Sequence, residues 1–151
     1  MMHKSEKRDA YRRMMYAVRT KRLIEIGIGS YSDYLAGAWW KERRERYRQE
    51  HAGACGSVQC RYCETRAADL HHTSYQRLGA EDDADLLPLC REHHAEWHTF
   101  GSVQPATAAQ REILRRHGYA EAFISSATFG RTFNLIGALG RGEVRSPREF
   151  G

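Results

Sequence analysis

Residues 60–98 read CRYCETRAADLHHTSYQRLGAEDDADLLPLCREHHAEWH and hold three of the four cysteines and five of the eight histidines of the 151-residue chain. Cysteine and histidine recur at two knuckle spacings, Cys60-x2-Cys63 and Cys90-x2-His93. In a chain of the cytoplasmic type, paired knuckles separated by a loop are typical of a tetrahedral zinc site rather than of disulfides. We therefore expect these four residues to hold one structural Zn²⁺.

The loop that such a site closes brings further metal-binding side chains with it. His71 and His72 are adjacent within the loop, and His94 and His98 follow the second knuckle. On a helix, residues four apart share one face, so His94 and His98 would point the same way. Cys55 precedes the first knuckle. The sequence leaves open whether Cys55 is a bystander or replaces one of the four zinc ligands.

The order of these residues resembles the HNH endonucleases, and especially their zinc-knuckle branch in phages and bacteria. The resemblance rests on two runs, His71-His72-x2-Tyr75-x2-Leu78-Gly79-x-Glu81 and Asp85-Leu86-x2-Leu89-Cys90-x2-His93-His94-x3-His98. Residues 34–44, YLAGAWWKERR, are more weakly similar to a helix that often precedes the knuckle in that family. The fold that this implies is α+β, a small ββα-metal (His-Me finger) core with a zinc knuckle, flanked by N- and C-terminal helices.

The resemblance also implies a role for each histidine outside the zinc set. His72, the second of the pair, would be the general base that deprotonates the attacking water. His71 and His94 would bind one catalytic divalent ion, either Mg²⁺, Mn²⁺, Ni²⁺ or Zn²⁺. His98 would be a further ligand of that ion or a contact to phosphate.

Three features depart from the family pattern, and the additional cysteine Cys55 is one of them. Asp85 stands where the family has the asparagine that braces the catalytic loop, and an ionised carboxylate can accept hydrogen bonds but cannot donate them. We interpret Asp85 as a variant of that brace and so as part of the catalytic set. His93 stands where a cysteine is usual, which suits zinc equally well.

The function that follows from the resemblance is metal-dependent hydrolysis of DNA phosphodiester bonds, leaving 5′-phosphate and 3′-hydroxyl ends. A divalent ion can neutralise the phosphoryl oxygens and assist the departing 3′ oxygen, and a neutral histidine can take a proton from water. A second interpretation belongs to a different class. Zinc knuckles with basic helices also form non-catalytic DNA-binding or assembly modules, in which the remaining histidines are ordinary surface or core residues.

Charge is distributed unevenly along the chain. Residues 1–50 carry 13 Lys and Arg against 7 Asp and Glu, residues 51–100 carry 4 against 8, and residues 101–151 carry 7 against 4. Basic flanks around an acidic centre fit a DNA partner held mainly through its backbone phosphates, although solvated helix faces have the same pattern. The candidate DNA contacts are Arg12, Arg13, Lys41, Arg43, Arg44 and Arg48.

The chain is long enough for one compact domain with helical additions. We expect a basic helical extension over residues 1–54, the zinc-knuckle core over 55–100, and a C-terminal helix with a basic tail over 101–151. Thr107-x-x-Gln110 has the spacing of a capping box and predicts the start of that helix. Residues 129–151 show no sustained period, and we expect an extended arm or a disordered tail there.

The sequence also predicts location and partners. Apolar runs long enough to cross a membrane are missing, and the first twenty residues are too charged for a signal segment, so we expect a cytoplasmic protein. Tyr11, Met14, Met15 and Val18 form an apolar stripe at helical spacing. That stripe could pack on the core or on a second copy, and we expect a homodimer or a larger phage or defence complex.

Overall fold

The computed structural model describes residues 4–147. These residues form a small, mostly helical α+β fold with one two-stranded antiparallel sheet. Contacts between residues divide the chain into two compact units, Met1–Cys90 and Arg91–Gly151. This boundary differs from the three segments expected from the sequence, because it falls between the last two zinc-knuckle residues.

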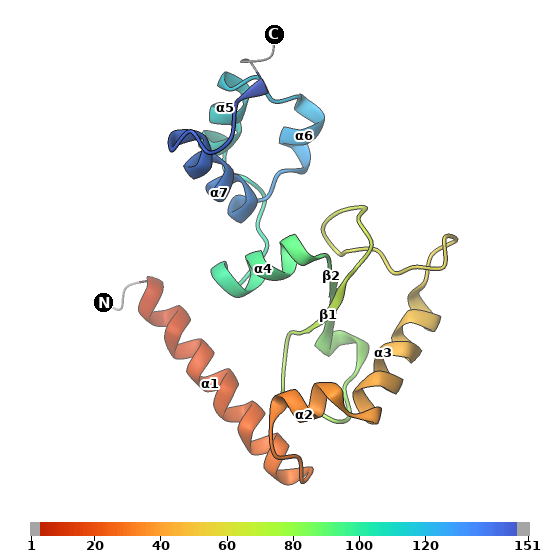
Figure 1. Ribbon diagram of the computed structural model, residues 1–151. Helices are drawn as coiled ribbons and strands as arrows, with labels where there is room; N and C mark the ends of the chain where they lie inside the picture. The colour runs from red at the N-terminus through yellow and green to blue at the C-terminus, as the bar shows by residue number, and fades with distance from the viewer. Residues whose placement is uncertain (1–3, 148–151) are drawn as a thin grey trace. The chain divides into compact units, whose positions relative to one another are not determined.

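The first unit begins with three helices, α1 (Lys4–Glu25), α2 (Tyr31–Ala36) and α3 (Ala38–His51). Gly27 adopts a φ of 73°, a left-handed conformation that turns the chain after α1. Ser30 then caps α2, since its hydroxyl accepts a hydrogen bond from the Asp33 amide at 3.1 Å. In Figure 1, α2 connects the other two helices, and it packs against both of them.

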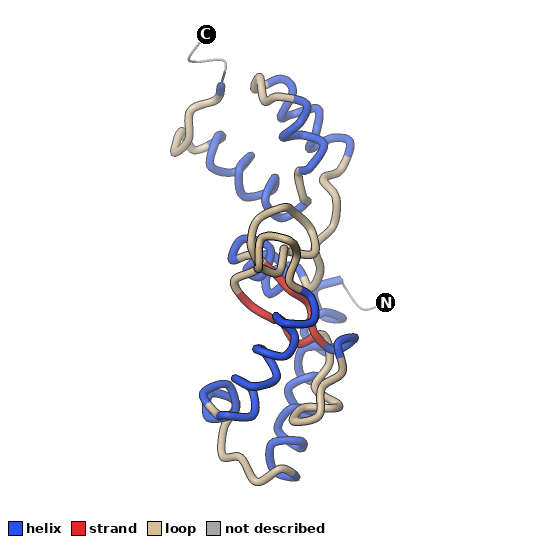
Figure 2. Tube along the Cα trace, turned by 90° about the vertical axis from the view of Figure 1, so that its right-hand side faces the viewer, coloured by secondary structure: helices blue, strands red, loops and turns tan. Residues whose placement is uncertain are grey.

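Strand β1 (Asp69–His72) pairs with strand β2 (Leu86–Leu89) in antiparallel register, with Asp69 opposite Leu89 and His72 opposite Leu86. Figure 2 shows the two strands as one hairpin. The 3₁₀ turn η1 (Asp83–Asp85) leads directly into β2. β1 includes both His71 and His72, and alternation along a strand therefore sends these two side chains to opposite faces.

The core of the first unit lies between the helices and one face of this hairpin. Trp40 of α3 is 3% exposed and belongs to the core, whereas its neighbour Trp39 is 54% exposed. Partly buried residues of α1, including Met15 and Val18, pack against this core, while Tyr11 and Met14 of the same stripe are exposed. The buried members of the cluster are Leu23, Tyr34, Trp40, Tyr47, Tyr75, Leu78 and Leu86.

The second unit contains α4 (Arg91–Phe100), α5 (Ala108–Arg116), α6 (Glu121–Ser126) and α7 (Phe129–Gly140). The predicted capping box is confirmed: the Gln110 amide donates to the Thr107 hydroxyl, and the Gln110 side chain accepts from the Thr107 amide. A separate cluster of Ala106, Leu114, Ile124 and Ala127 forms the core of this unit.

Helix α7 corrects the expectation of an irregular tail after residue 129. Glu96 of α4 is buried and accepts hydrogen bonds from the Thr128 hydroxyl at 2.6 Å and from the Gly130 amide at 2.8 Å, which anchors the start of α7. The Phe100 ring of α4 packs against Phe129 and Phe133 of α7. Residues 148–151 of the expected arm lie outside the described residues. Within residues 4–147, no helix has the length and apolar content needed to cross a membrane.

Candidate metal centre

The zinc-knuckle residues lie together. Cys60 and Cys63 occupy a tight turn in which the Cys60 amide donates to the Thr65 carbonyl at 2.8 Å. The Arg61 amide donates to the Pro88 carbonyl at 2.9 Å and so ties this turn to β2. Because Cys90 directly follows β2, these bonds hold both knuckles near the same end of the hairpin.

The geometry of the set fits a tetrahedral zinc ion. One potential ligand atom from each of Cys60, Cys63, Cys90 and His93 lies within 4.8 Å of the others. The Sγ atoms of Cys63 and Cys90 are 3.8 Å apart. A tetrahedron with Zn–S bonds of about 2.3 Å has edges of about 3.8 Å, so this separation matches two thiolates on one zinc.

The protonation of the set also favours metal binding. Burial raises the pKa of the Cys63 thiol, but hydrogen bonds involving Thr65, Cys60 and Cys90 outweigh it, and the net shift is downward. Burial lowers the pKa of His93, because a buried imidazole is less easily charged. Zinc binds the thiolate and the neutral imidazole, which are the forms that these shifts favour.

Cys55, whose role the sequence left open, does not belong to the set. Its side chain is exposed and interacts with the Ser57 hydroxyl at 3.0 Å. That hydrogen bond lowers the pKa of the Cys55 thiol. All four cysteines are in the thiol form rather than in disulfides.

A second group of potential ligands consists of His71, His94 and His98, each with a ring nitrogen within 4.8 Å of the others. His94 and His98 are on α4, one turn apart, and their Nε2 atoms are 3.0 Å from each other. Two imidazole nitrogens at this distance can share a proton or turn toward one cation. The predicted ligand set for a catalytic ion is therefore brought together, with imidazole donors that suit Zn²⁺, Ni²⁺ and other transition metals.

His72 does not join this group. Its side chain is 2% exposed, and both ring nitrogens have hydrogen-bonding partners: Nδ1 lies 2.9 Å from the Tyr31 hydroxyl and Nε2 lies 3.1 Å from Glu81 Oε1. The Trp40 ring centroid is 4.5 Å from that of His72. Tyr34 and Tyr75 complete an aromatic cage around the imidazole.

Glu81 determines which tautomer His72 adopts in its neutral form. Burial raises the pKa of Glu81, but hydrogen bonds from His72 and Tyr34 outweigh it, so that the net pKa is lowered. An ionised Glu81 can only accept, and His72 must donate from Nε2. Burial raises the pKa of Tyr31 and keeps its hydroxyl protonated, so this hydroxyl can donate to His72 Nδ1. Sequence reasoning did not give Tyr31 and Glu81 this role, although Glu81 belongs to the motif that carries the resemblance.

Asp85 lies at the end of η1, directly before β2, and holds the loop between the two strands in place. Its carboxylate is buried and accepts hydrogen bonds from the Arg77 guanidinium and from the Asp82 amide. The Asp85 carbonyl accepts from the Thr73 amide at 2.8 Å, which joins the two ends of the same loop. A residue that can only accept is suited to this position because the Arg77 guanidinium and the Asp82 amide both donate to it.

The predicted DNA contacts fall into two kinds. Arg43 does not fit the prediction of a DNA contact, because it is 5% exposed. It donates a hydrogen bond to the Glu81 carbonyl at 3.0 Å and pairs with Asp83, so it stabilises the loop between β1 and β2. Arg13 and Lys41 are exposed. The remaining candidates, Arg12, Arg44 and Arg48, are at least partly accessible.

Comparison with protein-family models, with curated proteins and with solved structures gives no match for this chain.

Proposed function

We propose that this protein is a metal-dependent DNA endonuclease with a ββα-metal core of the HNH type. The observation that supports it most is the three-histidine group of His71, His94 and His98 beside a separate set of zinc ligands. A structural zinc site needs only four ligands, so the three additional imidazoles have no role in it.

In the proposed reaction, His71, His94 and His98 would hold one divalent cation, which when bound would supply charge neutralisation for phosphodiester hydrolysis. Asp85 keeps the loop between the strands in place through Arg77 and Asp82. Basic residues outside the centre hold backbone phosphates and provide affinity with little base recognition.

His72 remains the proposed general base, and its surroundings set a condition on that role. A base must reach the proton that it removes, directly or through one water molecule. Because Nε2 donates to Glu81, Nδ1 is the nitrogen that can accept a proton, and His72 meets this requirement only after its hydrogen bond with Tyr31 opens. DNA binding would then have to rearrange the aromatic cage before cleavage.

The burial of His72 favours a second candidate function, a non-catalytic zinc-stabilised module that binds DNA. In that module His72 is a packed and hydrogen-bonded core residue, and the basic surface is the only functional part. The two candidates share the zinc site and the DNA partner. They differ in whether the protein cuts DNA.

Plasmid nicking separates these candidates. Zinc-loaded protein is incubated with supercoiled DNA and added Mg²⁺, Mn²⁺, Ni²⁺ or Zn²⁺, and wild type is compared with His71→Ala and His94→Ala. We expect wild type to nick the plasmid and both variants to lose on the order of a hundredfold or more in rate. His117→Asn, which changes a histidine of α5's C-terminal end, serves as the control and should cut like wild type. A wild type that binds duplex DNA but cuts with none of these ions supports the binding module instead.

A further inference from the structure

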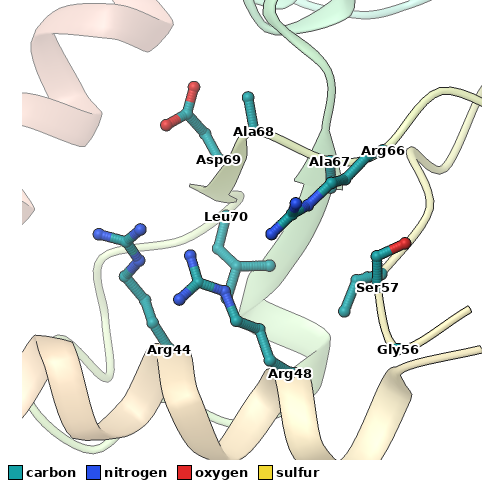
Figure 3. A pocket seen from close by; sticks show the side chains of 10 residues that line it. Arg44, Arg48, Gly56, Ser57, Arg66, Ala67, Ala68, Asp69 and Leu70 are labelled. Carbon is teal, nitrogen blue, oxygen red and sulfur yellow. The ribbon is translucent and has the colours of Figure 1, made fainter.

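Three arginines of the first unit surround one pocket. Arg44 and Arg48 lie one turn apart on α3, and Arg66 comes from the segment between the first knuckle and β1. In Figure 3, Arg44 and Arg48 rise from α3 toward β1, and the Arg66 guanidinium approaches from the other side of Leu70. Sequence reasoning had placed Arg44 and Arg48 among many basic residues and had not singled out Arg66.

Positive charge outweighs negative charge around this pocket. Three arginines and one aspartate, Asp69, line it. Arg48 also has an exposed contact of 3.8 Å with Glu45 on its own helix. Three guanidinium groups around one small pocket repel one another, which costs electrostatic free energy in the folded chain. A bound anion removes this repulsion.

The size and chemistry of the pocket indicate which anion it takes. Its volume is about 40 Å³, and a water-sized group needs roughly 10–15 Å³ of such volume. The pocket therefore accepts the oxygens of one phosphate group. Guanidinium groups also match phosphate geometry, since each can donate two parallel hydrogen bonds.

We propose that Arg44, Arg48 and Arg66 together bind one backbone phosphate of DNA. The assignment of the phosphate to DNA rests on the proposed function, whereas the anion pocket itself does not. Leu70, which lines the pocket, alternates with His71 along β1, so their side chains belong to opposite faces of the strand. Because His71 is a proposed ligand of the catalytic cation, the phosphate in this pocket is a flanking one that positions the duplex, rather than the phosphate that is cut.

Salt dependence of DNA binding tests this proposal, because the slope of log K against log salt concentration reports the number of phosphates neutralised, at about 0.9 for each. Affinity for a short duplex is measured at several salt concentrations without an added catalytic ion. The variants are Arg44→Gln, Arg48→Gln, Arg66→Gln and the triple variant. Arg46→Gln, exposed on α3 but not lining the pocket, is the matched control for loss of one charge.

We expect the triple variant to reduce the slope by roughly 0.9, because all three arginines hold one phosphate, and each single variant to reduce it by no more than that. Arg46→Gln should weaken binding less than Arg66→Gln does. An unchanged slope in the triple variant overturns the proposal. A loss of about 0.9 for each arginine that adds up in the triple variant also overturns it, because that result means that the arginines hold three separate phosphates. Melting temperature and zinc content equal to those of wild type confirm that the variants are folded.

Inorganic phosphate distinguishes the source of the ligand. If calorimetry shows that free phosphate binds wild type but not the triple variant, while DNA binding is equal in both, the pocket is a site for a small anion and the DNA assignment is wrong. Plasmid nicking is scored separately. A wild type that never cuts but shows the expected slopes rejects the nuclease and retains the phosphate pocket.

Discussion

Asp85 and Arg77 form two parallel hydrogen bonds, from Arg77 Nε to Oδ2 at 2.8 Å and from Arg77 Nη2 to Oδ1 at 2.9 Å. The same carboxylate accepts from the Asp82 amide at 3.0 Å and so completes a capping box around η1. The Asp85 carboxylate is thus matched by an arginine eight residues earlier in the chain. The Asp85 carboxylate is therefore a hydrogen-bond acceptor that is held by donors from Arg77 and Asp82.

Asp85→Ala should lower the free energy of unfolding by about 1 kcal/mol or more, because it removes a cap and leaves the Asp82 amide unsatisfied. Urea unfolding measures this change. Arg77→Ala is the matched control and should cost less, since Arg77 is half exposed and the cap at Asp82 remains. Equal stability of Asp85→Ala and wild type would mean that the brace contributes nothing.

His72→Ala should destabilise the protein by about 3 kcal/mol, since it leaves a cavity beside Trp40 and removes a buried partner of Glu81. A role as general base predicts that this variant loses cleavage, and the buried ring adds a loss of stability to that expectation. His72→Gln keeps a hydrogen-bonding side chain and should recover part of the stability. Thermal unfolding and plasmid nicking are compared for both variants.

The two readouts separate the roles of His72. If His72 is the base, His72→Gln recovers stability without recovering cleavage. If His72→Gln cuts as fast as wild type, the base lies elsewhere. A His72→Ala protein as stable as wild type would contradict the buried hydrogen bonds.

Glu81 should make stability sensitive to acid. Its pKa is lowered on folding, mainly because the hydrogen bonds from His72 and Tyr34 outweigh burial. Its contribution is therefore complete above the ordinary pKa of 4.5 and is lost as pH falls through the lowered folded-state value. Unfolding free energies measured from neutral to acidic pH should fall more steeply for wild type than for Glu81→Gln. Loss of zinc at low pH affects both proteins, so parallel curves would refute the contribution of Glu81.

Protein purified without added metal should contain about one tightly bound zinc per chain, measured by elemental analysis. Cys63→Ala should lose this zinc and much of its folded structure, because zinc binding and folding are coupled. Cys55→Ala is the matched control and should keep both, since Cys55 lies outside the ligand set. Zinc retained by Cys63→Ala, or a folded wild type without zinc, would overturn the assignment.

Gly130→Ala should destabilise the second unit by about 1–3 kcal/mol. A Cβ at this position would lie 2.5 Å from Glu96 Cγ and 2.6 Å from the Phe100 ring, so α7 would have to move away from α4. Gly140→Ala at the other end of α7 meets no atom within 4 Å and should be neutral or slightly stabilising. Thermal unfolding of the two variants checks the difference, and equal melting temperatures would contradict the close packing.

The zinc set and the capping box of α5 could be predicted from the sequence because each depends on spacing over a few residues. The position of His72 could not, since it depends on how far β1 continues. One further residue of strand sends the ring to the opposite face and into the aromatic cage. Helix α7 was missed for a different reason: its stability comes from Glu96 and Phe100, more than twenty residues earlier, while its own glycines weaken the local helical signal.

The two knuckles leave the ribosome at different times during synthesis of the protein. Cys63 and Cys90 are 27 residues apart, and His93 follows Cys90 by three more. A ribosome adds roughly 5–20 residues per second, so Cys60 and Cys63 emerge seconds before their partners. The first unit therefore cannot close its metal site until the start of the second has left the ribosome, and until then its two thiols are exposed to oxidation and to competing metals.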